Sequence, residues 1–431
     1  MIANRLSAYL ALRNIHYGWV VAVTTFLTML ATAGAMGSAG VMIAPLQQEF
    51  GWDIADISFA MAVRLVLFGL LGPFAAAFMN HFGVRKVVIC ALTLILMGVL
   101  GATLMRELWQ LILWWGVVVG VGTGMTALVL GATVATRWFS QRRGLVVGLM
   151  TASNATGQLV FLPLLAALTE AWGWRAALAF VLIIITVAMA LVALLMSDYP
   201  SDLGLPVYGE TEITPRPSMS GRGLGDMMLS PLVALREASK SGTFWVLFGT
   251  FFVCGLSTNG LIQTHWISIC GDFGMAPVAA AGMLAMIGIF DFAGTIFAGW
   301  LSDRYDNRWL LFWFYGLRGL SLIFLSYSGF SFYELSLFAI FYGLDWVATV
   351  PPTVRLAAER FGRERANLFF GWIFAGHQIG AATAAWGTGT LRDDLATYMP
   401  ALQIAGFMCL IAALSVLTMR RSGRPAVRAL A

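Results

Sequence analysis

The sequence predicts an all-α polytopic membrane protein with twelve transmembrane helices, and three observations lead to this fold class. First, the 431 residues are 59% hydrophobic and only 11% charged, whereas soluble domains carry roughly 25% charged residues. Second, the mean hydropathy is +0.82. Third, long apolar runs recur along the chain, and a helix needs about 20 apolar residues to cross a bilayer core. A membrane β-barrel would instead show short strands of alternating hydrophobicity.

Each apolar run is interpreted as one helix, and charged or glycine-containing stretches separate the runs. The first run is too long for a signal peptide and lacks a small-residue cleavage site, so we expect it to remain as a helix. In the tenth run, Pro351-Pro352 predicts a bend. In chain order, we expect the helices near 17–43, 54–78, 87–105, 108–134, 144–168, 174–196, 243–271, 277–301, 309–329, 332–358, 365–391 and 398–419.

Lysine and arginine gather on one side of the predicted helices. Most of the 26 such residues lie in the N-terminal segment, the long loop after the sixth run, the C-terminal tail and the short loops of the same side. Cytoplasmic loops of membrane proteins carry this excess, so both termini are predicted to be cytoplasmic. The asymmetry also accounts for the net charge of +5, and no nucleic-acid partner is expected.

The chain contains an internal repeat. When the sequence is shifted by 223 residues, Glu49-Phe50-Gly51 meets Asp272-Phe273-Gly274, and the charged and glycine positions recur at corresponding loop ends. Two parallel six-helix repeats around a central site are an architecture of transporters. We therefore expect an N-terminal six-helix bundle (1–196), a cytoplasmic linker (197–242), a C-terminal six-helix bundle (243–419) and a basic cytoplasmic tail (420–431).

Two loops at corresponding positions of the repeat resemble a loop of a known family. The stretch "GWLSDRYDNR" (299–308) resembles the Gly-x-Leu-x-Asp-Arg-x-Gly-x-Arg loop of the major facilitator superfamily, with Asp306 where glycine is usual. The first copy, "AAFMNHFGVRK" (76–86), has Asn80-His81 in place of Asp-Arg. The resemblance implies that both loops tether helix ends and thereby shift the balance between the inward-facing and the outward-facing conformation. The implied latch residues are Asp303, Arg304 and Arg308, and in the weaker first copy Asn80, Gly83 and Arg85.

Further stretches narrow the resemblance to the bacterial monocarboxylate-porter-like and oxalate:formate-antiporter-like branch of this superfamily. They include "YGWVV" (17–21), "RWFSQRRGLVVGL" (137–149), "YPSDLGLPVYG" (199–209) and "THWISICGDFG" (264–274). The resemblance implies a multi-pass protein of the plasma membrane, the inner membrane in a bacterium, with small organic anions as substrates. We also expect the protein to function as a monomer in the lipid bilayer.

An aspartate, Asp291, interrupts the eighth apolar run, and ionisable groups inside membrane helices usually mark a functional pathway. With a helical rise of about 1.5 Å per residue, Asp291 lies at the same depth as Arg318 of the ninth run, near mid-bilayer. We therefore expect the two to pair, with Asp291 carrying a proton and Arg318 binding a substrate carboxylate through two hydrogen bonds. The alternative is a static ion pair that only joins two helices.

The family resemblance agrees with this assignment, because monocarboxylate carriers are understood to use an eighth-helix aspartate and a nearby arginine. Their Asp-x-x-x-Arg pattern reads "DFAGT" here, with Thr295 at the arginine position. The positive charge must therefore come from elsewhere, and Arg318 is the expected source.

Other polar residues inside the predicted helices complete the candidate site. Arg64 is a second anion contact or a gate, or else it pairs with an acidic or carbonyl group between helices. Asp345 belongs to a polar and aromatic stripe of the tenth helix, although it could instead neutralise Arg64 or Arg318. For the other candidates the alternative is ordinary helix packing, and for His377 a proton relay is also open. The candidate substrate-binding residues are Arg318, Arg64, Asp345, Tyr342, Trp346, Asn259, Gln263 and His377.

The sequence contains no catalytic or phosphate-binding motif that would indicate an enzyme. The four cysteines have no metal-site spacing, so neither a metal nor a cofactor is expected. We expect a secondary active transporter that works by alternating access and moves a small monocarboxylate or related organic anion with protons. The alternatives are anion-for-anion exchange, efflux of amphipathic drugs or metabolites, and a membrane ligand sensor. The sensor is disfavoured because the linker and tail leave no room for an output domain.

Overall fold

The regular elements in the computed structural model are helices, which confirms the predicted all-helical fold class. The structure describes residues 2–126, 128–215, 224–361 and 366–419, so the tail predicted at 420–431 lies outside the described residues. Within these ranges, β-structure is limited to an isolated bridge between Phe139 and Tyr208. This bridge joins the start of the linker to the end of a helix.

The helices before the long linker cover the six predicted runs of the first half. They are α1 (Ile2–Ala11), α2 (Gly18–Phe50), α3 (Ile54–Phe82), α4 (Val84–Thr103), α5 (Leu108–Leu111), the π-helix η1 (Ile112–Val118), α6 (Val119–Met125), α7 (Leu128–Trp138), α8 (Arg143–Trp172) and α9 (Trp174–Leu195).

The linker and the second half of the chain are also helical. Their elements are the 3₁₀ helix η2 (Pro200–Leu203), α10 (Leu224–Ala238), α11 (Gly242–Gly255), the π-helix η3 (Leu256–Gln263), α12 (Thr264–Asp272), α13 (Pro277–Arg304), α14 (Asn307–Ser326), α15 (Phe332–Asp345), α16 (Val350–Phe361), α17 (Ala366–Leu395) and α18 (Met399–Val416).

Ten helical stretches among the described residues are long and apolar enough to cross a membrane. The remaining two predicted runs, 144–168 and 365–391, fall on α8 and α17, which are 30 residues long each. The count of twelve transmembrane helices therefore stays a prediction. Helix α2 has 33 residues and continues beyond the predicted end at 43, through Pro45 to Phe50, and it ends at Gly51, which has a left-handed backbone conformation.

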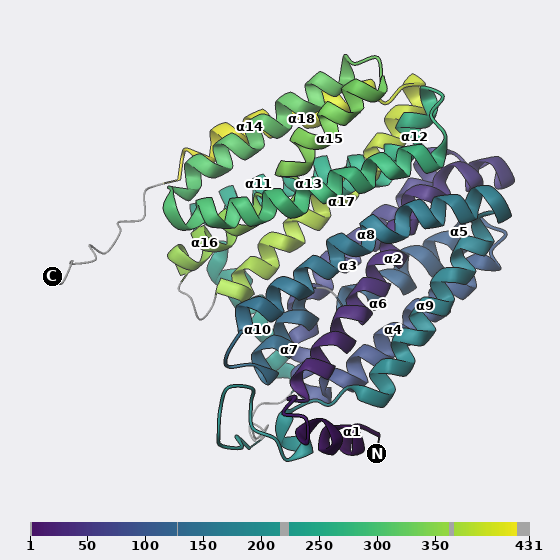
Figure 1. The fold of residues 1–431 in the computed structure, drawn as a ribbon. Helices are drawn as coiled ribbons and strands as arrows, with labels where there is room; N and C mark the ends of the chain where they lie inside the picture. Colours follow the sequence, from purple (N-terminus) through teal and green to yellow (C-terminus); the bar gives the residue numbers. More distant parts are fainter. Residues whose placement is uncertain (1, 127, 216–223, 362–365, 420–431) are drawn as a thin grey trace.

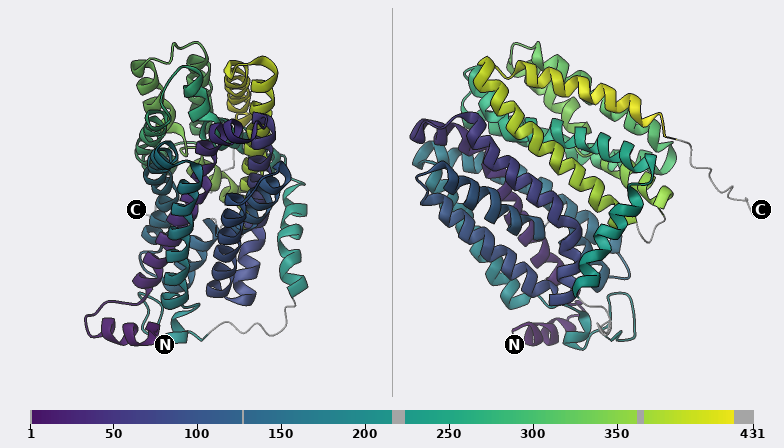
Figure 2. Two further views of the ribbon diagram at one scale, coloured as in Figure 1. Left: turned by 90° about the vertical axis from the view of Figure 1, so that its right-hand side faces the viewer. Right: turned by 180° about the vertical axis from the view of Figure 1, so that it is seen from behind.

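The helices form two groups, which Figures 1 and 2 show side by side. The first group consists of α2–α9 and the second of α11–α18, and they meet where α3 packs on α17 and α8 packs on α13. Helix α10 of the linker lies against both α3 and α17, and the Trp372 indole donates a 2.8 Å hydrogen bond to the Pro231 carbonyl. The linker helix thus contacts both groups at one end of the molecule, which we call the linker end.

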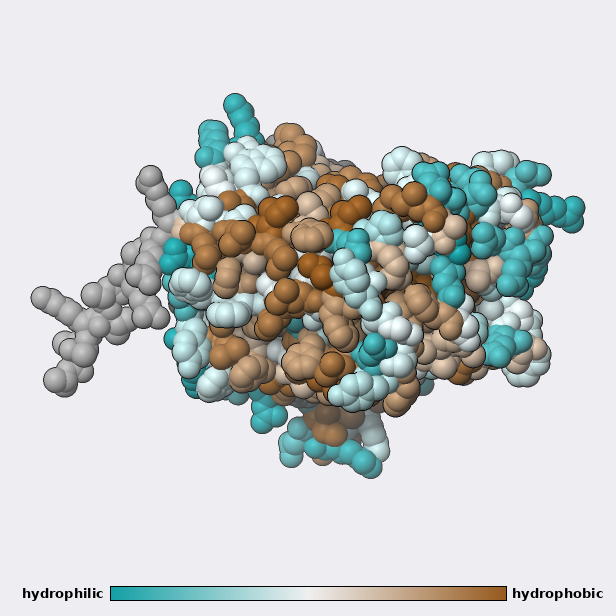
Figure 3. Space-filling model, turned by 90° about the horizontal axis from the view of Figure 1, so that it is seen from above, coloured by the Kyte–Doolittle hydropathy of each residue, from teal (hydrophilic) through white to brown (hydrophobic). Residues whose placement is uncertain are grey.

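The outer surface of the helices is apolar. Figure 3 shows hydrophobic residues over the middle of one face and hydrophilic residues gathered toward its right-hand edge. On α14, Trp313 is 58% exposed, and on α18, Phe407 is 58% exposed. Soluble monomers rarely expose apolar surface on this scale, whereas a lipid bilayer accommodates it.

Glycines allow close packing of α11 and η3 against α17. A Cβ atom at Gly255 would lie 1.8 Å from the carbonyl oxygen of His377, and one at Gly380 would lie 1.9 Å from the carbonyl oxygen of Phe252. Small residues let membrane helices approach at backbone distance. This contact sets the polar residues of η3 beside those of α17.

Candidate functional site

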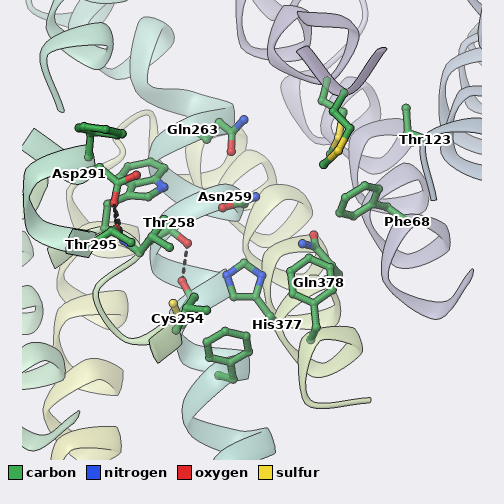
Figure 4. Close-up of a pocket in the computed structure, with 18 of the residues that line it drawn as sticks. Phe68, Thr123, Cys254, Thr258, Asn259, Gln263, Asp291, Thr295, His377 and Gln378 are labelled. Carbon is green, nitrogen blue, oxygen red and sulfur yellow. Dashed lines mark hydrogen bonds between the residues drawn. The ribbon is translucent and has the colours of Figure 1, made fainter. Parts of the chain in front are cut away.

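A cavity of about 380 Å³ lies between the two groups of helices. Residues of α2, α3, α6 and α8 line it from the first group, and residues of α11, η3, α13 and α17 line it from the second, together with the segment between α15 and α16. Figure 4 shows Asp291 on one side of the cavity and Phe68 on the opposite side. The cavity is therefore placed where relative movement of the two groups would change its shape.

The two walls differ in chemistry. The first group contributes methionine, phenylalanine and threonine side chains, such as Met29, Met36 and Thr123. The second group contributes the ionisable and amide side chains, and among the described lining residues neither lysine nor arginine occurs. The polar lining residues of the second group are Cys254, Thr258, Asn259, Gln263, Asp291, Thr295, His377 and Gln378.

Asp291 lies on α13, is 4% exposed and lines the cavity. One carboxylate oxygen, Oδ1, accepts hydrogen bonds from the Val347 N–H at 2.9 Å and from the Thr295 hydroxyl at 3.1 Å. Both donors are neutral. Thr295, which occupies the position of the expected arginine, therefore supplies a hydroxyl in place of a positive charge.

The predicted Asp291–Arg318 pair is wrong, because Arg318 forms its ion pair with Asp345. The Arg318 Nε lies 2.7 Å from Asp345 Oδ2. The other guanidinium nitrogens donate to Cys254 Sγ at 2.9 Å, to the Asp345 carbonyl and to the Trp346 carbonyl. Arg318 is fully buried. The equal depth of Asp291 and Arg318 did not decide the pairing, because the direction in which a side chain leaves its helix matters as well.

A helix break accounts for the contacts of both charged groups. Helix α15 ends at Asp345 and α16 begins at Val350, so residues 346–349 are not helical. A helix end leaves backbone N–H and C=O groups without partners. Asp291 accepts from the freed N–H of Val347, while Arg318 donates to the carbonyls of Asp345 and Trp346. Two buried side chains of opposite charge thus stabilise the break.

The position of the break corrects the bend predicted at Pro351-Pro352. The two prolines lie in the first turn of α16, where a missing N–H costs nothing. In a continuous helix, Pro351 and Pro352 would have no N–H to donate to the carbonyls of Val347 and Ala348, and their rings would clash with those carbonyls. This explains why the helix is interrupted at 346–349.

Arg64 lies on α3 behind the cavity wall and is 3% exposed. Its Nη1 donates to the Met36 carbonyl at 2.9 Å, and its guanidinium carbon lies 5.9 Å from the Trp115 ring centroid. Its Nε has no hydrogen-bond partner, and no acidic side chain of the described ranges pairs with it. Of the two pairings considered for Arg64, with an acidic group or with a backbone carbonyl, the structure has the second. The positive charge of Arg64 therefore has no counter-ion among the described residues.

The remaining predicted residues separate into two sets. Asn259, Gln263, Trp346 and His377 line the cavity, whereas Tyr342, Asp345, Arg64 and Arg318 do not. The Tyr342 hydroxyl points elsewhere, because it donates to the Ser257 carbonyl at 2.6 Å.

Sequence reasoning missed Gln378 and Cys254 as cavity residues. Gln378 is adjacent to His377, and its position in the same apolar run was the signal that could have found it. Cys254 had no such signal in the sequence, because its relevance comes from the contact with Arg318.

The predicted latch residues lie at the ends of helices. In the second half, Asp303 forms an ion pair with Arg355, Arg304 donates to the Trp300 carbonyl at 3.1 Å, and Arg308 pairs with Asp306 at 2.8 Å. Asp306, which replaces the usual glycine, accepts from the Arg308 N–H and caps α14. These contacts are local to the second group.

In the first half, the weaker copy still makes contacts. Asn80 accepts a 2.7 Å hydrogen bond from Arg137, and the Arg85 N–H donates to Asp198 at 2.9 Å. Gly83 has a φ of +91°, and a Cβ there would lie 2.4 Å from an Asp198 oxygen, so only glycine fits. In the 223-residue repeat, Asn80 corresponds to Asp303, with an amide instead of a carboxylate, whereas the arginine partners Arg137 and Arg355 are not at equivalent positions.

Comparisons with known proteins agree with this architecture. The family model described as Major Facilitator Superfamily matches residues 24–385 and 266–430. The chain is 25% identical over 386 residues to an uncharacterized MFS-type transporter, YcxA, of Bacillus subtilis, covering 88% of this chain and 90% of that one. It is 26% identical over 394 residues to monocarboxylate transporter 13 of Rattus norvegicus, covering 90% and 86%.

A solved structure has the same fold. The xylose transporter XylE from E. coli, in a partially occluded inward open conformation, matches with a TM-score of 0.70 at 13% identity, covering 94% of this chain and 98% of that one. At this identity the match concerns the fold alone.

Proposed function

This chain belongs to the Major Facilitator Superfamily, and we propose that it carries a small organic anion, a monocarboxylate or a related compound, together with protons. It is a multi-pass membrane transporter and not an enzyme. We place it in the plasma membrane, the inner membrane in a bacterium, as a monomer with both termini and the linker in the cytoplasm. The named monocarboxylate transporters among its relatives support the substrate class.

One observation carries this proposal, namely the arrangement of buried charges. Among the described residues, four arginine and aspartate side chains are less than 5% exposed: Arg64, Asp291, Arg318 and Asp345. Arg318 and Asp345 neutralise each other as an ion pair. Arg64 and Asp291 are left without a charged partner, on opposite groups of helices. If Asp291 takes up a proton, the charge of Arg64 is uncompensated, and an anion in the cavity restores neutrality.

This arrangement couples the anion to the proton. A substrate anion next to an ionised Asp291 would experience repulsion in a low-dielectric surrounding. The hydrogen-bond donors to Asp291 are neutral, and Arg318 acts on it only as a nearby charge, since its ion pair is with Asp345. The site therefore binds an anion best when Asp291 carries a proton, and both leave together.

Alternating access would use the two groups of helices as the moving parts. The break between α15 and α16 is the proposed bending point, because Asp291 contacts it directly through Val347. The ion pair of Asp303 with Arg355 and the contact of Asn80 with Arg137 are the proposed latches at helix ends.

Transport in proteoliposomes tests this proposal. An inward-directed proton gradient should drive accumulation of a radiolabelled carboxylate, and Asp291→Asn should abolish the dependence on the gradient. The matched control is Asp56→Asn, which changes an exposed aspartate at the start of α3 and should leave transport unchanged. Gradient-driven accumulation by Asp291→Asn with a normal pH response contradicts the proton role.

Export of amphipathic drugs or metabolites is a second candidate. The observation that favours it is the cavity wall itself, which has a carboxylate and several aromatic rings and, in the described ranges, neither lysine nor arginine. Competition with an amphipathic cation in the same assay separates the two candidates. Exchange of one anion for another would instead show uptake that needs an internal anion and no proton gradient.

A further inference from the structure

We infer that the transported anion is amphipathic, with one carboxylate and an aromatic or branched apolar body, and is larger than a two- to four-carbon acid. This inference rests on the proposed function, since it specifies the substrate class of the same cavity. Three features of the cavity support it: its volume, the distribution of polar groups over its walls and its row of aromatic rings.

The volume of the cavity exceeds that of a short acid. At about 30 Å³ for each water-sized group, the 380 Å³ cavity holds roughly a dozen such groups. A three-carbon acid has about half that number of non-hydrogen atoms and would leave the rest of the cavity to water. Pockets of about 300–1,000 Å³ typically bury most of the surface of a drug-sized ligand.

Unsatisfied polar atoms on the second group provide a place for the carboxylate. His377 is 8% exposed and Gln378 is 1% exposed, and both line the cavity. The His377 Nδ1 and the Gln378 Oε1 have no hydrogen-bond partner in the described part of the chain. A buried polar group without a partner is costly. A carboxylate would accept from the His377 imidazole N–H and from the amide nitrogen of Gln378, whereas the Gln378 Oε1 is an acceptor and suits a hydroxyl or a protonated carboxyl group. Arg64 lies on α3, one turn before Phe68 of the same cavity, and adds a favourable field.

The opposite wall is suited to an apolar body. Met29, Met36 and Phe68 line the cavity from the first group, and methionine adapts its shape to varied apolar ligands. A ligand can shift the balance between two arrangements only if it interacts differently with each. A short acid bound at His377 and Gln378 would touch mainly the second group, whereas an acid with an apolar body reaches both groups.

Aromatic rings form a row across the boundary between the groups. Phe374 stacks on His377 with centroids 5.6 Å apart and planes at 9°. Phe68 of the first group meets Phe374 edge-on, with centroids 5.9 Å apart at 65°. An aromatic body beside this row gains about 0.5–1.5 kcal/mol for each ring pair beyond its buried area. The row therefore favours a ring over an aliphatic chain of equal size.

Isothermal titration with the full chain in nanodiscs tests the inference, using propanoate, 3-phenylpropanoate and 3-phenylpropanamide as probes. We expect 3-phenylpropanoate to bind at least 10-fold more tightly than propanoate. Phe68→Ala and the milder Phe68→Leu should reduce this ratio to threefold or less. Phe78→Ala is the matched control, because Phe78 lies on the same helix but outside the cavity lining, and it should keep the ratio.

The outcomes distinguish this inference from the proposed function. Equal binding of propanoate and 3-phenylpropanoate, or an unchanged ratio in both Phe68 variants, overturns the inference and leaves anion binding intact. Equal binding of the acid and its amide contradicts anion recognition, but it supports the apolar body. A lack of binding for all three probes overturns both.

Discussion

At the scale of single residues, the two buried arginines have different surroundings and therefore different expected roles. Arg318 uses its guanidinium for Asp345, Cys254 and two backbone carbonyls. Few of its donors are left for a substrate, so its role is to hold the helix break. Arg64 has one carbonyl partner and a free charge, which makes it the better candidate for attracting an anion.

Removal of Arg318 should destabilise the fold more than it alters substrate affinity. Because Asp345 would be left as an unpaired buried charge, we expect Arg318→Ala to cost about 3–5 kcal/mol of stability. Arg304→Ala, at an exposed helix end, is the control and should change stability by less than about 0.5 kcal/mol. Thermal unfolding in detergent measures both. If Arg318→Ala folds normally and only loses carboxylate binding, Arg318 is a substrate contact.

The double variant Arg318→Ala/Asp345→Ala checks the same ion pair. Because it leaves no buried charge unpaired, it should be more stable than Arg318→Ala alone. A double variant whose loss equals the sum of the single losses would contradict direct pairing.

Neutralisation of Arg64 should weaken anion binding without a large loss of stability. We expect Arg64→Gln to raise the dissociation constant of a carboxylate by at least about tenfold, which is about 1.4 kcal/mol. Arg64→Lys keeps the charge and should retain most of the affinity. Binding of a neutral amide serves as the control, and an equal loss for amide and carboxylate would argue for a packing role.

At the scale of elements, close packing of α11 and η3 against α17 decides where the cavity residues lie. The contact needs the glycines of both helices, because the backbone carbonyl of His377 occupies the space of a Cβ at Gly255. The same contact brings Cys254, Asn259 and Gln378 to one wall. A methyl group added between the two helices would push them apart and displace this wall.

A matched pair of glycine variants tests the element contact. Gly255→Ala should destabilise the protein by about 3 kcal/mol or more, since the added methyl group overlaps backbone. Gly249→Ala lies on the same helix with nothing within 4 Å of the added Cβ, so it should be neutral or slightly stabilising. Thermal unfolding with retention of the monomer peak on size exclusion compares the two. If Gly255→Ala and Gly249→Ala were equally stable, the close backbone contact between α11 and α17 would be contradicted.

At the scale of the whole molecule, contacts between the two groups tie them together at the end opposite the linker. The Ala55 N–H donates to Asp393 at 2.7 Å, and a Cβ at Gly389 would lie 3.0 Å from the Ser58 hydroxyl oxygen. At Gly40 of α2, the carbonyl oxygen of Gln263 lies 2.9 Å from the position of an added Cβ. If the two groups move during transport, these contacts must open.

A cross-link across this end should stop transport. A Cβ at Gly389 would lie 3.0 Å from the Ser58 hydroxyl oxygen, so cysteines at these two positions would have their side chains in contact. We expect Ser58→Cys/Gly389→Cys to lose transport after mild oxidation and to regain it after reduction. Each single cysteine variant is the control and should respond to neither treatment. Full activity of the oxidised and verifiably cross-linked protein would show that this end does not open.

The sequence by itself determined the fold class, the helical runs and the identity of the buried charged residues, because these follow from local hydropathy and length. It also identified Asp291, Asn259, Gln263, Trp346 and His377, which line the cavity, since polar groups in apolar runs are conspicuous. The partners of the charged groups depended on tertiary structure. Helical rise gives the depth of a residue, whereas the direction of its side chain depends on helix packing.

Only the tertiary structure placed Asp345 against Arg318 and left Arg64 and Asp291 without charged partners. It did so through a helix break that begins before Pro351 and exposes an N–H to Asp291 and two carbonyls to Arg318. Backbone groups without partners at a helix end form hydrogen bonds with nearby polar side chains. The sequence does not reveal which side chains lie near such a helix end, because this depends on how the helices pack.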